Sequence, residues 1–499
     1  MRHFHSPRQW YCLLSGCLAL PVLAEPAALP ALLSAGNDPF ATTRQQPPRL
    51  LLHPGDMARA TTITPCPDNT ALPNPLGLAD VVQHALCHHP QTREVWANAR
   101  AQVAQLGVAQ AAYLPNLGAT LSGSQGRSNS SGTTKDTRQA STRADLSWLL
   151  YDFGARGAAL DNARALLAAS IATQASTVQA LFLTAVQAYH QVQASQSALA
   201  AARESERASE TSFRAAEARF RAGTNTRADQ LQAQTAWSQA TLARIQAEGA
   251  LKTAQGNLAL IIGRDADTPL PLAPPPDLPP LAVREQAQTQ IRTLIDAARQ
   301  QRPDLLAAEA QLQAAQAAVA QASAAGYPTL TLAASTSQTR TTGNETVNTS
   351  SLGVNLVVPL FTGFSIHYKI RAAEALLESK TASRDRIRLQ VAQDVWKARH
   401  DLDTASQSLK TAASLLDSAR ESERMALGRY QAGVGTLLDL LTAQSAHATA
   451  RQQQVRAQYD WHVARATLAQ ALGTLDFNFL PALTGDTPRP PAISGTRQP

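Results

Sequence analysis

Cysteine and histidine side chains are the first candidates for chemistry in this sequence. The 499-residue chain has four cysteines; two lie before residue 24, and Cys66 and Cys87 remain. In an oxidising compartment a single remaining pair is expected to form a disulfide. His84, His88 and His89 lie close to Cys87, so a metal site is the alternative, although their spacing matches no recognised set of ligands.

The sequence contains no recognisable catalytic motif. There is no Ser/His/Asp arrangement and no HExxH helix, and the glycines of residues 126–133 lack the Gly-Lys-Ser/Thr of a phosphate-binding loop. The 44 Lys and Arg residues are mixed with 37 Asp and Glu residues, a pattern that does not favour nucleic-acid binding. We therefore expect no enzyme, no cofactor, no metal and no nucleic-acid partner.

The N-terminus is typical of an export signal. Arg2 and Arg8 precede an apolar run over residues 10–23, and small residues up to Ala24 suit signal-peptidase cleavage. This assigns residues 1–24 as a signal peptide. A lipoprotein cleavage box at Leu14–Cys17 is the alternative, and either interpretation takes the chain out of the cytoplasm.

Two copies of one unit make up most of the chain. The run Leu150–Gly154 corresponds to Leu360–Phe364, and Arg219–Gly223 corresponds to Arg429–Gly433, in both cases 210 positions later. We place the first repeat at 76–263, a linker at 264–282 and the second repeat at 283–475. A proline-rich extension of low order over 25–75 and a disordered tail over 476–499 complete the expected domains.

Each repeat is expected to contain very long helices. There is no proline between Gly154 and Gly223 or between Gly363 and Gly433, which allows helices of roughly 68 residues, about 100 Å long. Polar residues interrupt their apolar stretches, so we expect a coiled coil and no membrane-spanning helix. A helix of roughly 23 residues precedes each hairpin of strands, and a second long helix follows each glycine turn.

Two strand-like segments per repeat alternate apolar and polar residues. They occupy 117–122 and 144–151 in the first repeat and 330–334 and 352–358 in the second, around polar loops at 126–140 and 339–350. Such strands are typical of an outer-membrane barrel, and a soluble hairpin is the alternative. Four strands cannot close a barrel in lipid, so closure requires several copies of the chain.

These motifs resemble the TolC-like outer-membrane factor family over residues 76–475. The resemblance rests on the duplication, on Tyr151-Asp152-Phe153-Gly154, and on a glycine turn followed six residues later by Asp229 or Asp439. It implies a mainly α-helical homotrimer, with four strands per chain in a shared 12-stranded membrane β-barrel and a long helical periplasmic tunnel. The implied location is the cell outer membrane.

The resemblance implies a channel that docks with a periplasmic adaptor and an inner-membrane pump. The Tyr-Asp-Phe-Gly motif and an unlipidated N-terminus resemble the type I secretion branch, which exports proteins with an ABC transporter. A lipidated Cys17 would instead indicate multidrug efflux with an RND-type pump. A periplasmic coiled-coil scaffold without a pore is the more distant alternative.

The resemblance also suggests functional residues at the glycine turns. Gly223, Thr224, Gly433 and Val434 are expected to lie together at the periplasmic end and to contact the adaptor.

A gate is expected next to these turns. Asp229 and Asp439 would line a constriction, where carboxylates repeated around a trimer axis bind cations and raise an apparent pKa. Tyr430 resembles a family tyrosine that ties neighbouring helices together, with Asp229 as its expected partner. Gly435 and Thr442 replace an arginine and an acidic residue of the family pattern, which predicts a gate with fewer links.

Overall fold

The computed structural model describes residues 38–54, 66, 72–130, 133–273, 291–342 and 345–479. The predicted signal peptide, the Cys17 alternative and most of the C-terminal tail lie outside these residues. Residues 38–45 form a unit of their own, in which Asp38 accepts hydrogen bonds from Thr42 and Thr43 beside a short 3-10 helix, Thr42–Gln45. Everything below concerns the second unit, from residue 46 onward.

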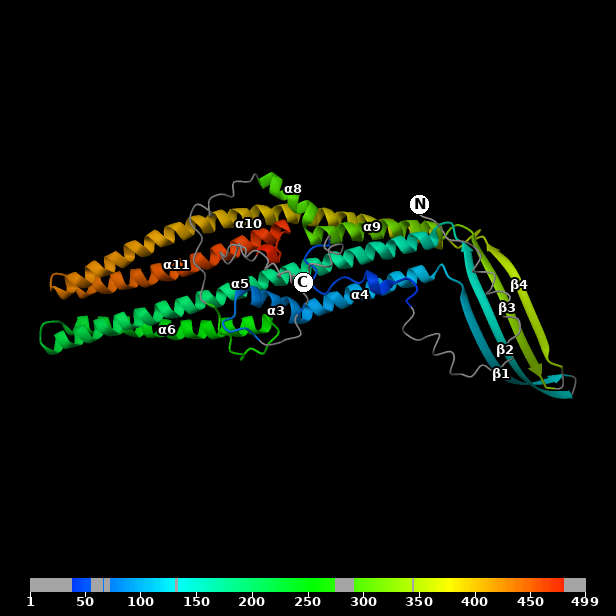
Figure 1. Cartoon of the computed structure of the whole chain (residues 1–499), viewed down its shortest axis with the longest axis horizontal. Helices are drawn as coiled ribbons and strands as arrows, with labels where there is room; N and C mark the ends of the chain where they lie inside the picture. Colours follow the sequence, from blue (N-terminus) through cyan, green and yellow to red (C-terminus); the bar gives the residue numbers. More distant parts are fainter. Residues whose placement is uncertain are drawn as a thin grey trace, which may run out of the picture. The chain divides into compact units, whose positions relative to one another are not determined.

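The same order of elements occurs twice along the chain (Figure 1). The first copy consists of α3 (Leu78–His88), α4 (Pro90–Ala111), β1 (Asn116–Ser130), β2 (Thr133–Tyr151), α5 (Ala155–Arg221) and α6 (Arg227–Ile261). The second copy consists of α8 (Ile291–Gln301), α9 (Pro303–Ala324), β3 (Thr329–Thr341), β4 (Val347–Val357), α10 (Ser365–Gln431) and α11 (Leu437–Leu472). Helices α5 and α10 both have 67 residues, which confirms the prediction of two equivalent long helices.

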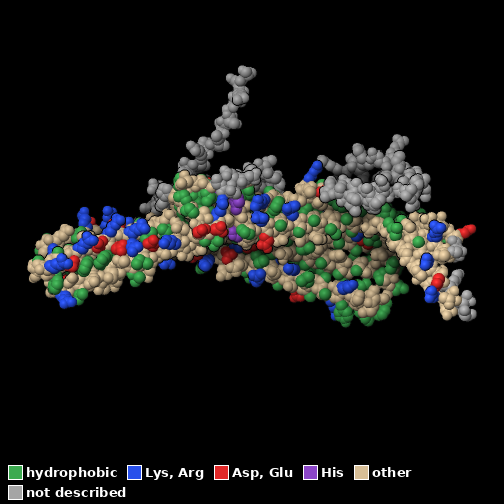
Figure 2. Space-filling model, turned by 90° about the horizontal axis from the view of Figure 1, so that it is seen from below, with side chains coloured by type: hydrophobic (Ala, Val, Ile, Leu, Met, Phe, Trp, Pro, Cys, Tyr) green, Lys and Arg blue, Asp and Glu red, His purple; other side chains and the backbone are tan. Residues whose placement is uncertain are grey.

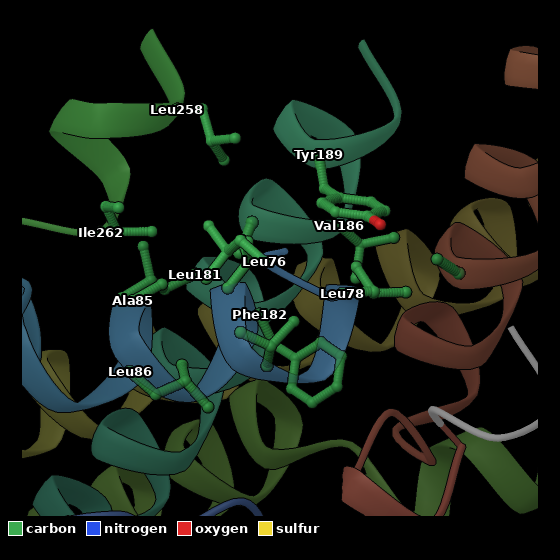
Figure 3. Packing of buried hydrophobic residues seen from close by; sticks show 14 of the residues in the cluster. Leu76, Leu78, Ala85, Leu86, Leu181, Phe182, Val186, Tyr189, Leu258 and Ile262 are labelled. Carbon is green, nitrogen blue, oxygen red and sulfur yellow. The ribbon is translucent and has the colours of Figure 1, made fainter. Parts of the chain in front are cut away.

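Helix α5 is the centre of the helical body. It packs against α3, α4 and α6 of its own copy and against α9 and α11 of the other copy. In the main core, Phe182 and Val186 of α5 lie among Leu78 and Leu86 of α3 (Figure 3). Within the described residues, α5 alone is long and apolar enough to cross a membrane by composition, but half of its apolar window is buried inside the chain. Helix packing therefore accounts for that hydrophobicity.

A buried pair of histidines joins the two repeats. The rings of His190 on α5 and His462 on α11 stack with centroids 4.5 Å apart. Burial and the nearby Arg465 lower the pKa of His190 to about 4, although a hydrogen bond that the His190 ring donates to the side-chain oxygen of Gln193 opposes the shift. The His190 ring is therefore neutral at physiological pH and packs as an apolar ring.

Part of the proline-rich extension is ordered, contrary to expectation. Gln179 donates to the carbonyl of Leu52 at 2.9 Å, Gln174 donates to that of Pro48 at 2.9 Å, and Leu50 and Leu51 are buried. The two glutamines satisfy carbonyls that would otherwise be buried without partners. Residues 46–54 are thereby fixed along α5.

Folded structure also extends into the predicted linker and tail. Leu76 donates to the carbonyl of Pro271 at 2.8 Å and pairs with Leu272 in an isolated parallel bridge. After α11, the 3-10 helix Phe477–Phe479 places Phe477 against Phe182. The prediction of disorder is therefore wrong for 476–479, because these aromatic side chains pack on the core.

The four strands form one antiparallel sheet in the order β1-β2-β3-β4. Its strands are longer than predicted, since pairing continues to Ser130 with Thr133 and to Thr339 with Val347. Most of the expected loops at 126–140 and 339–350 are therefore strand, because their Thr residues suit extended backbone and their hydroxyl groups bond across the pair, as Thr137 does to the Gly126 carbonyl and Ser350 to Thr336. A register shift after Leu149 sets Tyr151 opposite Leu330, so Tyr151 joins the face of Trp148 rather than the opposite face predicted from alternation.

The predicted disulfide is present between Cys66 and Cys87. The two Cα atoms lie 5.5 Å apart, and Cys87 is buried in the main core beside α5. The bond closes a loop with a sequence separation of 21 residues. It ties Cys66 of the predicted extension to the end of α3.

We expect Cys66→Ala to destabilise the protein by about 3 kcal/mol, because the unfolded chain regains the entropy of the opened loop. Cys66 is the better residue to change, since Cys87→Ala would also leave a cavity in the core. Urea unfolding of the exported protein measures the difference. Two free thiols in the exported parent protein, or an unchanged unfolding midpoint, would contradict this prediction.

Candidate functional site: the hairpin turns and the sheet

Both long hairpins reverse direction at a glycine. Gly223 and Gly433 each have a φ of 77°, in the left-handed region that only glycine adopts without steric cost. The N–H of Thr224 donates to the carbonyl of Arg219 at 2.9 Å, and Val434 makes the equivalent bond at 3.0 Å. These bonds satisfy the last carbonyls of α5 and α10, so both predicted turns are confirmed as turns.

The two turns lie together at the same end of the helices (Figure 1). The Arg219 guanidinium donates to the carbonyl of Tyr430 at 3.2 Å and lies 4.2 Å from the centre of its ring. Tyr430 is buried in a small apolar cluster with Ala216, Ala233, Leu437 and Leu440. This cluster holds the tips of the two hairpins against one another.

Asp229 and Asp439 occupy equivalent positions in the first turn of α6 and α11. The backbone N–H of Thr226 donates to Asp229 at 3.1 Å, and that of Thr436 donates to Asp439 at 3.3 Å. Each Asp therefore forms a capping box with the Thr that precedes it by three residues. At the tip, Asp439 is exposed and Asp229 is half-buried.

Hydrogen bonds from Thr436, with Arg429 nearby, lower the pKa of Asp439. This direction is opposite to the one expected for a ring of carboxylates. Such a ring requires neighbouring copies of the chain, whereas the capping interaction is complete within one copy. The Asp439 carboxylate of a single chain is thus a stable anion.

The expected bond between Tyr430 and Asp229 does not form within the chain. Asp229 turns back to Thr226, as the capping box requires. The hydroxyl of Tyr430 is buried and has no hydrogen-bond partner among the described residues. Within one chain the helix N-terminus captures the carboxylate of Asp229 instead, and a pairing with Tyr430 in the assembled gate stays a prediction.

The backbone explains one departure from the family pattern. A Cβ at Gly435 would lie 3.0 Å from the Cβ of Arg429 and 3.2 Å from the backbone nitrogen of Tyr430. No side chain fits at position 435 unless the turn shifts. Thr442, the second departure, lies in a groove of about 950 Å³ between α10 and α11, which Met425 and Leu438 also line.

The sheet at the other end of the long helices has one apolar face. Register places three apolar rows across the strands: Tyr151–Leu330–Leu356, Trp148–Leu332–Val354 and Leu117–Leu146–Ala334–Leu352. Leu117 and Leu352 are 77% and 75% exposed, so no described residue covers this face. The opposite face is polar or small, with rows such as Gly118–Asp145–Ser335–Ser351.

An ionic contact fixes the junction between β2 and α5. Arg156 donates to the buried carboxylate of Asp152 at 3.1 Å and to the carbonyls of Leu149 and Leu150 at 2.6 and 3.1 Å. Its guanidinium also lies 4.7 Å from the centre of the Tyr113 ring. Asp152 belongs to the Tyr-Asp-Phe-Gly motif, whereas Arg156 lies outside it, and only their i,i+4 spacing in the sequence indicates the ion pair.

The second junction is built differently. Thr362 and Ile366 replace the ion pair. Both junctions use two consecutive residues with positive φ, Phe153–Gly154 and Gly363–Phe364, in which the glycine changes place. Exposed aromatic side chains gather at these junctions: Tyr151, Phe153, Tyr327, Phe361 and Phe364. Such a group is typical of the interface between lipid and water in membrane barrels.

Arg156→Ala is expected to destabilise the first junction by about 3 kcal/mol, because the buried Asp152 carboxylate loses its counter-ion and keeps only the backbone N–H of residue 156 as a donor. Ile366→Ala, at the matched position of the second repeat, is the control and should cost less. The temperature at which the folded species converts to the unfolded one on a gel reports the effect. Equal losses for the two variants would show that the ion pair has no special role.

Comparisons with known proteins agree with this arrangement. A family model described as "Outer membrane efflux protein" matches residues 81–264 and 294–474. Protein CyaE of Bordetella pertussis is 34% identical over 430 residues, which cover 85% of this chain and 89% of that protein. Alkaline protease secretion protein AprF of Pseudomonas aeruginosa is 28% identical over 425 residues, covering 80% and 85%.

A solved structure shows the same fold. The Campylobacter jejuni CmeC outer membrane channel superimposes with a TM-score of 0.73 at 18% identity, covering 80% of this chain and 86% of that one. The family model spans most of both repeats, and a relative above 30% identity aligns along most of its length. The chain therefore belongs to the outer membrane efflux protein family, whose members are transport channels of the outer membrane and not enzymes.

Proposed function

We propose that three copies of this chain form an outer-membrane channel that exports proteins by type I secretion. The four-stranded sheet is the main support for a channel. Its apolar face is exposed, and its edge strands β1 and β4 each pair on one side only. Lipid cannot satisfy an open edge. Three sheets of four strands close a 12-stranded barrel and satisfy every edge.

Exposed apolar side chains on the long helices support assembly of several copies. Leu389 and Trp396 of α10 are 71% and 54% exposed, which is unusual in a periplasmic helix unless a neighbouring helix covers them. Three helical bodies side by side would enclose a tunnel. With the sheet in the outer membrane, 67-residue helices extend the turns about 100 Å into the periplasm.

The partners follow from this orientation. Gly223, Thr224, Gly433 and Val434 lie at the periplasmic end, where a periplasmic adaptor would dock and connect the channel to an inner-membrane ABC transporter. Charged side chains of both signs are interspersed toward this end (Figure 2). Protein export is favoured because a relative covering 80% of this chain is named for alkaline protease secretion. Drug efflux, with an RND-type pump, is the alternative.

Deleting the gene is expected to abolish secretion of one or more proteins and to leave drug susceptibility unchanged. Ser351→Arg should restore secretion, because Ser351 lies on the polar face of β4. Leu352→Arg should not, since a charge on the lipid face costs about 2–4 kcal/mol per chain. Culture supernatants and inhibitory drug concentrations are compared. Drug hypersensitivity with unchanged secretion would favour efflux, and equal rescue by both variants would contradict the assigned lipid face.

Asp439→Asn is expected to weaken cation selectivity and block by multivalent cations, if the exposed Asp439 carboxylates line the constriction. Asn retains the acceptor of the capping box, so α11 should keep its N-terminus. Asp80→Asn, which alters a capping box in α3 far from the turns, is the control. Single-channel recordings measure cation selectivity and block by multivalent cations. If both are unchanged in Asp439→Asn, Asp439 does not line the constriction.

A further inference from the structure

We propose that the outer end of the sheet binds the phosphate groups of a phosphorylated glycolipid in the outer leaflet, through Arg138 and Arg340. The inference rests on the proposed barrel, because it requires the apolar face of the sheet to contact lipid.

Register places both arginines on the lipid-facing side. Arg340 pairs with Ala140, and the even-numbered residues of β3 continue from it to Leu332 and Leu330 of the apolar rows. Arg138 pairs with Gln125, and alternation along β2 sets it on the same face as Leu146 and Trp148. Neither arginine faces the channel interior.

The two guanidinium groups are close enough to share one anion. Arg138 and Arg340 lie on neighbouring strands as a diagonal pair, because Ala140 is opposite Arg340 and Arg138 is two residues away. Such pairs have Cα atoms roughly 7–8 Å apart, and a phosphate accepts paired N–H donors from more than one arginine. Gly123 and Ala140 complete the row of Arg340, and the space around Gly123 is open.

No residue in the described part of the chain neutralises the charges of these two arginines. Arg127, one row farther out on the same face, makes two bonds to Asp136 at 2.7 and 3.1 Å. The side chains of Arg138 and Arg340 are exposed and have no hydrogen bond or ion pair with any described residue. An anionic partner complements them.

The height of the pair indicates which anion. Arg340 lies ten residues beyond Leu330, about 33 Å along the strand. At the usual tilt of 35–45°, this is roughly 25 Å along the membrane normal, the typical height of the lipid-embedded band of membrane barrels. On this sheet the apolar rows end at Ala334, and the polar rows of Thr336 and Gln338 lead from them to Arg340. Since the aromatic side chains at the junctions mark the periplasmic interface, Arg138 and Arg340 lie at the level of the outer headgroups.

The test measures binding of bisphosphorylated lipid A to the purified trimer in neutral detergent by native mass spectrometry. Lipid A with the same acyl chains but no phosphate is the matched ligand. Arg138→Gln combined with Arg340→Gln should weaken binding of the phosphorylated form by about tenfold or more and leave the other form unchanged. Arg143→Gln, on the same strand but on the polar face, should bind like the parent protein.

Three results would overturn the proposal. The first is an equal affinity of the parent protein for the two lipids, and the second is an unchanged affinity of the double variant for phosphorylated lipid A. The third is full displacement of bound lipid A by inorganic phosphate at the same concentration, which would indicate a site for free anions. Single-channel conductance of the same preparations separates this inference from the proposed function. A parent protein that forms no conducting trimer contradicts the function, whereas a conducting double variant with normal lipid binding contradicts only the glycolipid site.

Discussion

Backbone hydrogen bonding at the edges of a four-stranded sheet constrains everything else in this protein. Strands β1 and β4 each have one unpaired side, and in lipid each unsatisfied N–H or C=O costs several kcal/mol. A single chain cannot satisfy that requirement. In the proposed trimer, repetition of the chain around an axis would meet it, and the same axis would then determine what each helix contacts.

The two long helices are unequally buried within the chain, and the proposed assembly would cover the exposed side of α10. Helix α5 contributes Phe182, Val186 and Tyr189 to the main core, whereas its equivalent α10 leaves Leu389 and Trp396 exposed. The repeats share a fold but have different surroundings, one at the centre of the chain and one at its surface. In both repeats, many of the buried residues between helices are alanines, which let the helices pack close together.

The junctions between strand and helix show the same divergence. In the first repeat Arg156 neutralises a buried carboxylate and also binds two strand carbonyls, so the direction of β2 is coupled to the first turn of α5. In the second repeat the equivalent Thr362 and Ile366 cannot form this contact. One junction is thus held by directional bonds, and the other relies on packing and on the backbone of Gly363–Phe364.

The sequence alone determined the duplication, the long helices, the glycine turns, the disulfide and the alternation of the strands, because each depends on local periodicity or on residue types with few options. It could not determine strand length or the face of Tyr151, since cross-strand pairing decides both. It did not reveal the capping box of Asp229 either, in which the first turn of α6 competes for that carboxylate. Residues 46–54 are held by contacts with α5, which is distant in the sequence. Arg156 acts through the exact direction of the β2 carbonyls. Only the tertiary structure decides these two features.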